Sequence, residues 1–88
     1  MTGEVMADAT ARVELYGAAG CPYTAEWREH LAWNGVSFVE HDVETDGDAR
    51  ARLLSLTGGR AAVPVLVEDG RLKEIGWRGR SCAFSAGS

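Results

Sequence analysis

The sequence predicts a small α/β domain with elements in the order β-α-β-α-β-β, forming a mixed four-stranded sheet with two helices. Three observations carry this prediction: a stretch of alternating polar and apolar residues, two later stretches with helical character, and a two-residue hairpin signal near the C-terminal end. The chain has 88 residues, which is enough for one domain, and its 45% hydrophobic content is enough for a modest core.

The first strand is expected at Arg12–Tyr16, where polar and apolar side chains alternate as they do in a half-buried strand. Residues 1–11 before it show no periodicity and are expected to form a flexible tail. The glycine-containing segment 17–20 then interrupts the alternation, so the strand is expected to end there.

The first helix is expected over residues 23–33. Pro22 precedes it, and proline is well tolerated in the first turn of a helix. Asn34-Gly35 supplies the stop signal. Trp27 and Trp33 are six positions apart and cannot share a helix face, so we expect one in the core and the other exposed.

A second strand containing Val36 and Phe38 is expected to end near His41 or Asp42. The acidic segment that follows suits the positive end of a helix dipole, and apolar residues then recur at helical spacing. The sequence therefore predicts a second helix over residues 49–56.

The third strand is expected at Ala62–Glu68 and the fourth at Arg71–Ile75, because Asp69-Gly70 between them is a strong hairpin signal. The hairpin makes these strands antiparallel, whereas a right-handed crossover makes the first two strands parallel. Residues 85–88 are expected to be disordered, which leaves residues 12–84 as the domain.

Composition excludes several classes of protein. Two cysteines are too few for a disulfide-stapled secreted scaffold, and no apolar run is long enough to cross a membrane. The net charge of −4 gives no basic footprint for nucleic acid. His30 and His41 lie far from any cysteine pair at metal-ligand spacing, so no metal is expected. The acidic N-terminal segment does not resemble a secretory signal, and we expect a cytoplasmic location.

Cys21 is the most informative residue, because it stands between the first strand and the first helix. Free N–H groups and the dipole at a helix start stabilise a thiolate and lower a cysteine pKa from about 8.5 to roughly 3.5–7.5. Thr24 lies three residues later and can turn its hydroxyl toward the sulfur. The alternative is that Cys21 is a small buried apolar residue without chemistry.

The segment Cys21–Thr24 (Cys-Pro-Tyr-Thr) resembles the Cys-Pro-Tyr-Cys active site of glutaredoxins, with threonine in place of the second cysteine. The segment Thr57–Pro64 resembles their Thr-Gly-x-x-Thr-Val-Pro stretch, and Ile75-Gly76 stands where they carry a Gly-Gly pair. The resemblance covers roughly residues 12–82. It is closest to the UXX-star (seleno)protein group, whose members often carry selenocysteine at the position of Cys21.

The resemblance implies a thioredoxin-like fold of the glutaredoxin type, with the final helix short or absent. It implies a thiol–disulfide oxidoreductase that uses the Cys21 thiolate as its nucleophile and acts on glutathione or on protein disulfides. Two alternatives are a thiol peroxidase-type reductase and a glutathione-dependent module that binds an iron–sulfur cluster. We expect a monomer or a weak homodimer.

The resemblance also implies a set of substrate-binding residues. These are Pro22, Tyr23, Thr24, Arg60, Val63, Pro64 and Gly76. A cis peptide bond at Pro64 would let Val63 present its backbone N–H and C=O to a bound disulfide peptide, typically glutathione. Tyr23 would flank the sulfur, and Arg60 would pair with a glutathione carboxylate; the alternatives are a partly exposed aromatic residue and an ordinary surface arginine.

Cys82 is the second candidate catalytic residue. With threonine at position 24 the internal disulfide of a Cys-x-x-Cys pair cannot form. In glutaredoxin-like folds the segment after the fourth strand returns toward the active-site helix, so we expect Cys82 near Cys21 and hypothesise a disulfide between them on oxidation. Closing a loop of about 60 residues would stabilise the oxidised form by roughly 4 kcal/mol. The alternative is a free cysteine in a mobile segment.

Overall fold

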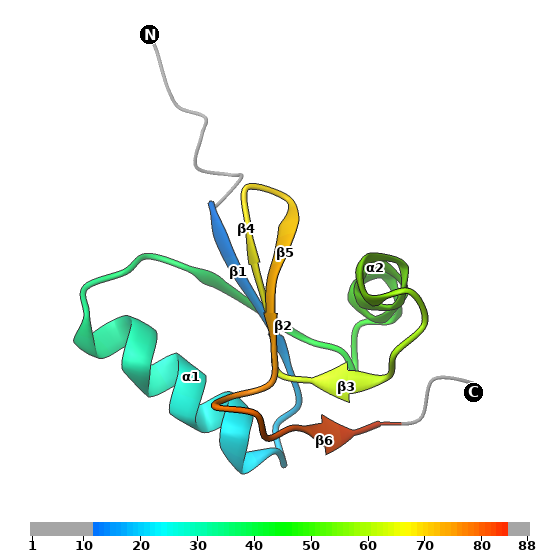
Figure 1. Ribbon diagram of the computed structural model, residues 1–88, viewed down its shortest axis with the longest axis horizontal. Helices are drawn as coiled ribbons and strands as arrows, with labels where there is room; N and C mark the ends of the chain where they lie inside the picture. Colours follow the sequence, from blue (N-terminus) through cyan, green and yellow to red (C-terminus); the bar gives the residue numbers. More distant parts are fainter. Residues whose placement is uncertain (1–11, 85–88) are drawn as a thin grey trace, which may run out of the picture.

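Strand β1 (Val13–Gly17) lies inside the sheet, between two neighbours of opposite direction. It pairs in parallel with β2 (Val39–Asp42) and antiparallel with β4 (Val65–Glu68), and β4 pairs antiparallel with β5 (Arg71–Ile75). The computed structural model describes residues 12–84, so the predicted tail at 1–11 and the predicted disordered end at 85–88 lie outside the described residues. The mixed four-stranded sheet with two helices is confirmed (Figure 1).

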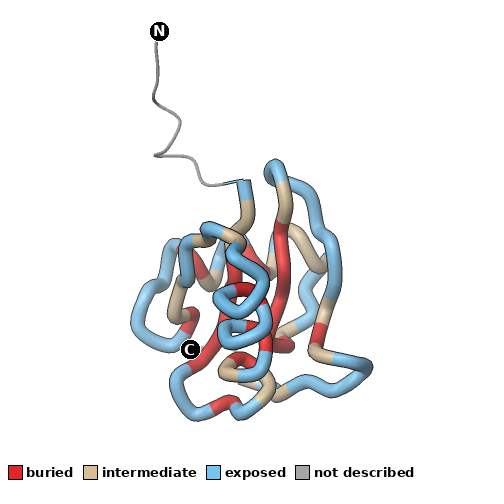
Figure 2. Tube along the Cα trace, turned by 90° about the vertical axis from the view of Figure 1, so that its left-hand side faces the viewer, coloured by how far each residue is buried: buried red, intermediate tan, exposed pale blue. Residues whose placement is uncertain are grey.

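The helices α1 (Pro22–Trp33) and α2 (Gly47–Thr57) cover opposite faces of this sheet (Figure 1). Successive side chains of a strand point to opposite faces of the sheet, so neighbouring residues pack against different helices. On β1, Leu15 packs with the α1 side and Tyr16 with the α2 side. Both central strands are therefore buried on two faces, as the red segments of Figure 2 show.

Helix α2 begins and ends at residues that fit its termini. The carboxylate of Asp46 accepts a hydrogen bond from the Ala49 amide at 3.1 Å, which satisfies one of the free N–H groups of the first turn. At the other end Gly58 has a φ of 73°, the left-handed conformation that closes a helix at least cost for glycine. The predicted second helix is confirmed, with two more residues at its start and one more at its end.

The third predicted strand is wrong as a single element. It is two strands, β3 (Ala62–Val63) and β4, separated by Pro64, whose peptide bond to Val63 is cis. Proline has no N–H for a sheet ladder, and the chain leaves the main sheet at this point. Strand β3 pairs instead with β6 (Cys82–Ala83), a two-residue strand that the sequence did not predict.

The second strand is also shorter than predicted. Val36 and Phe38 precede β2 and pack onto the apolar cluster beneath α1, so they fill the core without joining the ladder. The expectation for the two tryptophans is confirmed, because Trp27 is buried and Trp33 is 91% exposed. Within residues 12–84, neither helix has the length and apolar character needed to cross a bilayer.

Candidate functional site

Cys21 is the N-cap residue of α1, and a short loop joins it to the C-terminal end of β1. It is 4% exposed, its amide donates to the carbonyl of Ala18 at 3.1 Å, and its carbonyl accepts from the Thr24 amide at 3.1 Å. Pro22 is the first helical residue and has no N–H, so the Tyr23 amide is the first amide of the helix. The sulfur of Cys21 thus lies at the positive end of the helix dipole.

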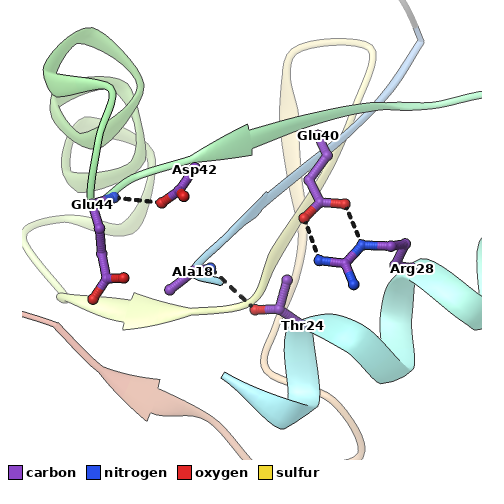
Figure 3. A network of polar contacts seen from close by, with 6 residues as sticks. All are labelled: Ala18, Thr24, Arg28, Glu40, Asp42 and Glu44. Atoms are coloured by element: carbon purple, nitrogen blue, oxygen red, sulfur yellow. Dashed lines mark hydrogen bonds and ion pairs between the residues drawn. The ribbon is translucent and has the colours of Figure 1, made fainter. Parts of the chain in front are cut away.

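Thr24 is fully buried and holds the loop that precedes Cys21. Its hydroxyl accepts a hydrogen bond from the Ala18 amide at 3.3 Å, as Figure 3 shows. The hydroxyl is therefore engaged by the backbone of this loop, and its turn toward the Cys21 sulfur stays a prediction. Gly17 is required beside it, because a Cβ at this position would overlap the Thr24 side chain.

Cys82 is joined to Cys21 by a disulfide, across 61 positions of the sequence. The two Cα atoms are 6.1 Å apart, a separation that disulfides ordinarily span. The expectation that the segment after the fourth strand returns to the start of the first helix is thereby confirmed. Cys82 is half-buried, and it stands opposite Val63 in the β3–β6 pair.

Val63 lies beside the Cys21 sulfur, and the next residue, Pro64, is hydrogen-bonded to Gly76. The Cys21 sulfur lies 3.9 Å from the Val63 carbonyl oxygen, and Val63 and Pro64 are buried. The Gly76 amide donates to the Pro64 carbonyl at 2.6 Å. A side chain at Gly76 would meet the Arg80 carbonyl, and its φ of 92° also favours glycine. These predicted positions are therefore brought together.

Trp77 extends the site along the outside of α1. Its ring packs edge-on against Trp27 at a centroid distance of 4.9 Å and contacts His30 at 5.2 Å. The Trp27 indole N–H donates to the Gly76 carbonyl at 2.7 Å, which fixes the start of this segment to the helix. Trp77 thus lies at the edge of the site as an anchored aromatic residue.

A cleft of about 440 Å³ lies between the first turns of α1 and the turn that follows β5. It is lined by Tyr23, Glu26, Trp77, Arg78 and Arg80. Among these residues, Tyr23 is two positions after Cys21 in the sequence and Arg80 is two positions before Cys82. Sequence reasoning missed Glu26, which is on α1, and the two arginines, which a tight turn between Trp77 and Arg80 brings to the cleft without any periodic signal.

Arg60 is another predicted site residue, and it does not line the cleft. It is exposed in the loop between α2 and β3, where its amide donates to the Thr57 hydroxyl at 3.0 Å. The loop is thereby held by Thr57, while the Arg60 side chain is exposed to solvent.

An ion pair fixes α1 to the sheet one helical turn beyond the site. The Nε and Nη2 atoms of Arg28 each donate to one oxygen of the Glu40 carboxylate at 2.7 Å, as Figure 3 shows. These hydrogen bonds raise the pKa of Arg28 above its usual range. The pair is partly solvent-exposed, so its main effect is to orient the helix on β2 and its contribution to stability is small.

No group of three or more His, Cys, Asp or Glu side chains that could hold a metal ion occurs among residues 12–84. The chemistry that the arrangement supports is therefore that of the two sulfurs. A cysteine at a helix start, bonded to a second cysteine on a short outer strand, can exchange between a disulfide and a dithiol.

Comparisons with known proteins agree with this geometry. A curated relative, the probable glutaredoxin slr1562 of Synechocystis sp., is 35% identical over 60 residues, which are 67% of this chain and 55% of that protein. The chain thus spans about half the length of this relative. The crystal structure of the thioredoxin-like protein BC3987 is 34% identical, with a TM-score of 0.62 over 69% of this chain and 82% of that one.

Two further solved structures share the fold. The glutaredoxin of Archaeoglobus fulgidus has a TM-score of 0.67 at 24% identity, over 81% of this chain and 80% of that one. A wheat glutaredoxin has a TM-score of 0.64 at 23% identity, over 76% and 64% of the two chains. The fold is therefore thioredoxin-like, as expected. The glutaredoxin family model matches residues 13–73, which is more than half of the sequence, and the chain belongs to the glutaredoxin family.

Proposed function

We propose that the chain is a thiol–disulfide oxidoreductase in which Cys21 is the nucleophile and Cys82 is the resolving thiol. The observation that carries the proposal is the disulfide between a cysteine at the start of α1 and a cysteine on β6. Family membership supports the same class of reaction. The substrate is a disulfide, carried either by a protein or by a small thiol compound such as glutathione.

The first half of the reaction begins from the dithiol form. The helix dipole and the Tyr23 amide stabilise the Cys21 thiolate, which attacks one sulfur of the substrate disulfide. A new bond forms between Cys21 and that sulfur, the substrate S–S bond breaks, and the other substrate thiol leaves as a thiolate. The product of this step is a mixed disulfide on Cys21.

The second half of the reaction uses Cys82. Its thiolate attacks the Cys21 sulfur, the Cys21–Cys82 bond forms, and the second substrate thiol is released. The two protons lost by the cysteines go to the two departing thiolates. Two electrons pass from the protein to the substrate, so the protein ends as the disulfide and the substrate as two thiols.

The cycle closes when an external thiol reduces the Cys21–Cys82 disulfide. Two glutathione molecules supply the two electrons and leave as oxidised glutathione, which makes glutathione the proposed co-substrate. A reducing cytoplasm is the compartment in which this direction of the reaction is favoured. The family resemblance and the two-cysteine composition support this assignment.

The substrate-binding residues are proposed from their places around the disulfide. Val63 offers its backbone carbonyl beside the Cys21 sulfur, Gly76 is hydrogen-bonded to Pro64, and Tyr23 lines the cleft. Pro22 and Thr24 act by shaping the loop that holds Cys21. The Arg60 pairing with a carboxylate, the peroxidase and iron–sulfur alternatives, the UXX-star assignment and the monomer or weak dimer stay predictions from the sequence.

Trapping the mixed disulfide tests the proposal. The dithiol form is mixed with oxidised glutathione, quenched with acid and weighed by mass spectrometry. The wild-type protein should pass to the internal disulfide, the Cys82→Ser variant should retain one glutathione, and the Cys21→Ser variant should react at least about a hundredfold more slowly.

Ser81→Ala is the matched control, because Ser81 is exposed and adjacent to Cys82. It should behave as the wild type does. A Cys21→Ser variant that reacts at the wild-type rate would overturn the assignment of the nucleophile. A Cys82→Ser variant that releases its glutathione without added thiol would overturn the role of Cys82.

A further inference from the structure

Strand β6 lies where an incoming substrate strand would have to lie. β3 runs directly beside Cys21, and the strand paired with it along its edge is β6. A backbone edge of this kind binds extended peptides by strand addition. Cys82 stands opposite Val63 and its sulfur is bonded to Cys21, so the chain itself demonstrates how a cysteine on such a strand meets the reactive sulfur.

The residues of β3 are buried, whereas those of β6, the strand paired with it, are partly or fully exposed. Ala62 and Val63 are at most 6% exposed and belong to the core, whereas Ala83 is exposed and Cys82 only half-buried. Among the described residues, no side-chain hydrogen bond or ion pair joins residues 78–84 to the rest of the chain. What holds β6 is the disulfide, a two-residue ladder, and Phe84.

Phe84 provides both a backbone and a side-chain contact. Its amide donates to the Ala61 carbonyl at 3.3 Å, which extends the ladder by one residue. Its side chain is half-buried and packs against the apolar cluster on the α2 side of the sheet. A strand on this edge therefore has three features: a cysteine opposite Val63, an exposed residue next, and an apolar side chain after that.

We propose that the edge of β3 and the contact site of Phe84 form a docking site for an extended polypeptide with an apolar residue two positions after its reactive cysteine, and that β6 is the chain's own occupant of that site. The inference rests on the proposed function and specifies its substrate class. In the disulfide form β6 fills the site. After reduction β6 competes with the substrate strand for the edge, and its return during the attack by Cys82 displaces the product.

The chemistry is that of the proposed function, with a position assigned to the substrate. The substrate cysteine takes the place of Cys82 opposite Val63, and Cys21 attacks its sulfur while its partner thiol leaves. Cys82 then attacks the Cys21 sulfur and the substrate cysteine departs as a thiolate. Formation of the β3–β6 ladder and release of the substrate strand are then the same event.

Peptides that copy β6 test the docking site in the Cys82→Ser variant, which stops at the mixed disulfide. The probe is acetyl-Arg-Ser-Cys-Ala-Phe-amide, whose cysteine carries nitrothiobenzoate as a coloured leaving group. It should react about tenfold faster than the same peptide with serine in place of phenylalanine, because the apolar side chain is buried on docking. The nitrothiobenzoate disulfide of cysteamine measures the reactivity of Cys21 without docking.

Backbone methylation supplies a matched pair of probes. Methylation of the phenylalanine amide removes the donor that corresponds to the Phe84 N–H and should slow the reaction. Methylation of the alanine amide should slow it less, because neighbouring amides of a strand point in opposite directions. Equal rates for all four peptides, with normal cysteamine reactivity, would overturn the docking site. Failure of every disulfide to react would instead overturn the proposed function.

A second substitution tests whether β6 occupies the site. In the Cys82→Ser background, Phe84→Ser weakens the internal occupant and should raise the rate with the phenylalanine peptide severalfold, while the cysteamine rate stays unchanged. Ala83→Ser, on the exposed side of the same strand, is the control and should change neither rate. A peptide rate that falls or stays constant after Phe84→Ser would show that β6 does not compete with the substrate.

Discussion

Strands β3 and β4 are separated by a single proline, yet they belong to two different kinds of sheet. β4 has a partner on each side, and Val65 and Val67 are almost completely buried. β3 has two residues and pairs with β6, which is joined to the rest of the molecule by a disulfide. One short stretch of sequence thus contributes both to the central four-stranded sheet and to a separate two-stranded sheet that contains a cysteine of the disulfide.

The largest expected effect is the loss of unfolding free energy when the disulfide that holds β6 is removed. Cys82→Ser removes the disulfide and should lower the free energy of unfolding by roughly 4 kcal/mol relative to the oxidised wild type, as the chain-entropy model estimates for a loop of about 60 residues. Urea denaturation of the variant and of both wild-type forms measures the difference. The free energy of unfolding of the variant should equal that of the reduced wild type. A variant as stable as the oxidised wild type would contradict the expected difference between β3, whose partner is held by the disulfide, and β4.

The next effect concerns β4 and its neighbours in the central four-stranded sheet. Leu66→Ala empties a buried site beneath α1 and should lower the free energy of unfolding by about 2–4 kcal/mol. The loss should be the same in the oxidised and the reduced protein, because the Leu66 side chain lies on the face of the sheet away from the disulfide cluster. A loss confined to one redox state would contradict the separation of the two sheets.

A smaller effect is expected at the start of α2, which packs on the face that β3 shares. Asp46→Ala removes the acceptor for the Ala49 amide and should cost about 1 kcal/mol of unfolding free energy. Asp46→Asn keeps an acceptor oxygen and serves as the control. Thermal unfolding followed by circular dichroism separates the two variants, and equal losses in both would argue against the cap.

The smallest effect is a pH dependence carried by Tyr16 of β1. Burial is the main cause that raises the pKa of Tyr16 above its usual value of 10.0, and the Arg52 side chain opposes it by donating to the phenol oxygen. A folded-state pKa above the unfolded one means that the contribution to stability is complete below pH 10 and declines above it. Tyr16→Phe should remove this decline, which denaturation between pH 8 and 11 would detect.

Local signals explain how much of the fold was predictable. Asp69-Gly70 predicted the β4–β5 hairpin, and both residues have positive φ there. Alternation along residues 12–16 predicted a half-buried strand at the position of β1, whereas the structure buries both of its faces. The division into β3 and β4 at Pro64 was not predicted, because an apolar run of β-branched residues has the same pattern whether it forms one strand or two.

The residues of the candidate site also divide into those that the sequence predicted and those that it did not. Cys21 was found because its neighbours in sequence, a strand and a proline, define its environment. Cys82 was found through the family resemblance, which implied where its segment returns. Arg78 and Arg80 were not found, since the turn that brings them to the cleft follows from the positive φ values at Gly76, Arg78 and Gly79 and leaves no periodic signal.

Gly76 has a consequence for the kinetics of the second cysteine. The Pro64 carbonyl and the Trp27 indole hold its backbone from two sides, so the chain beyond it starts from a fixed point. Six residues later stands Cys82, which can travel no more than about 20 Å from that point when the chain is fully extended. Such a short tether gives an effective concentration in the millimolar range or above. When Cys21 has formed a mixed disulfide, Cys82 should therefore attack it faster than a dilute external thiol does.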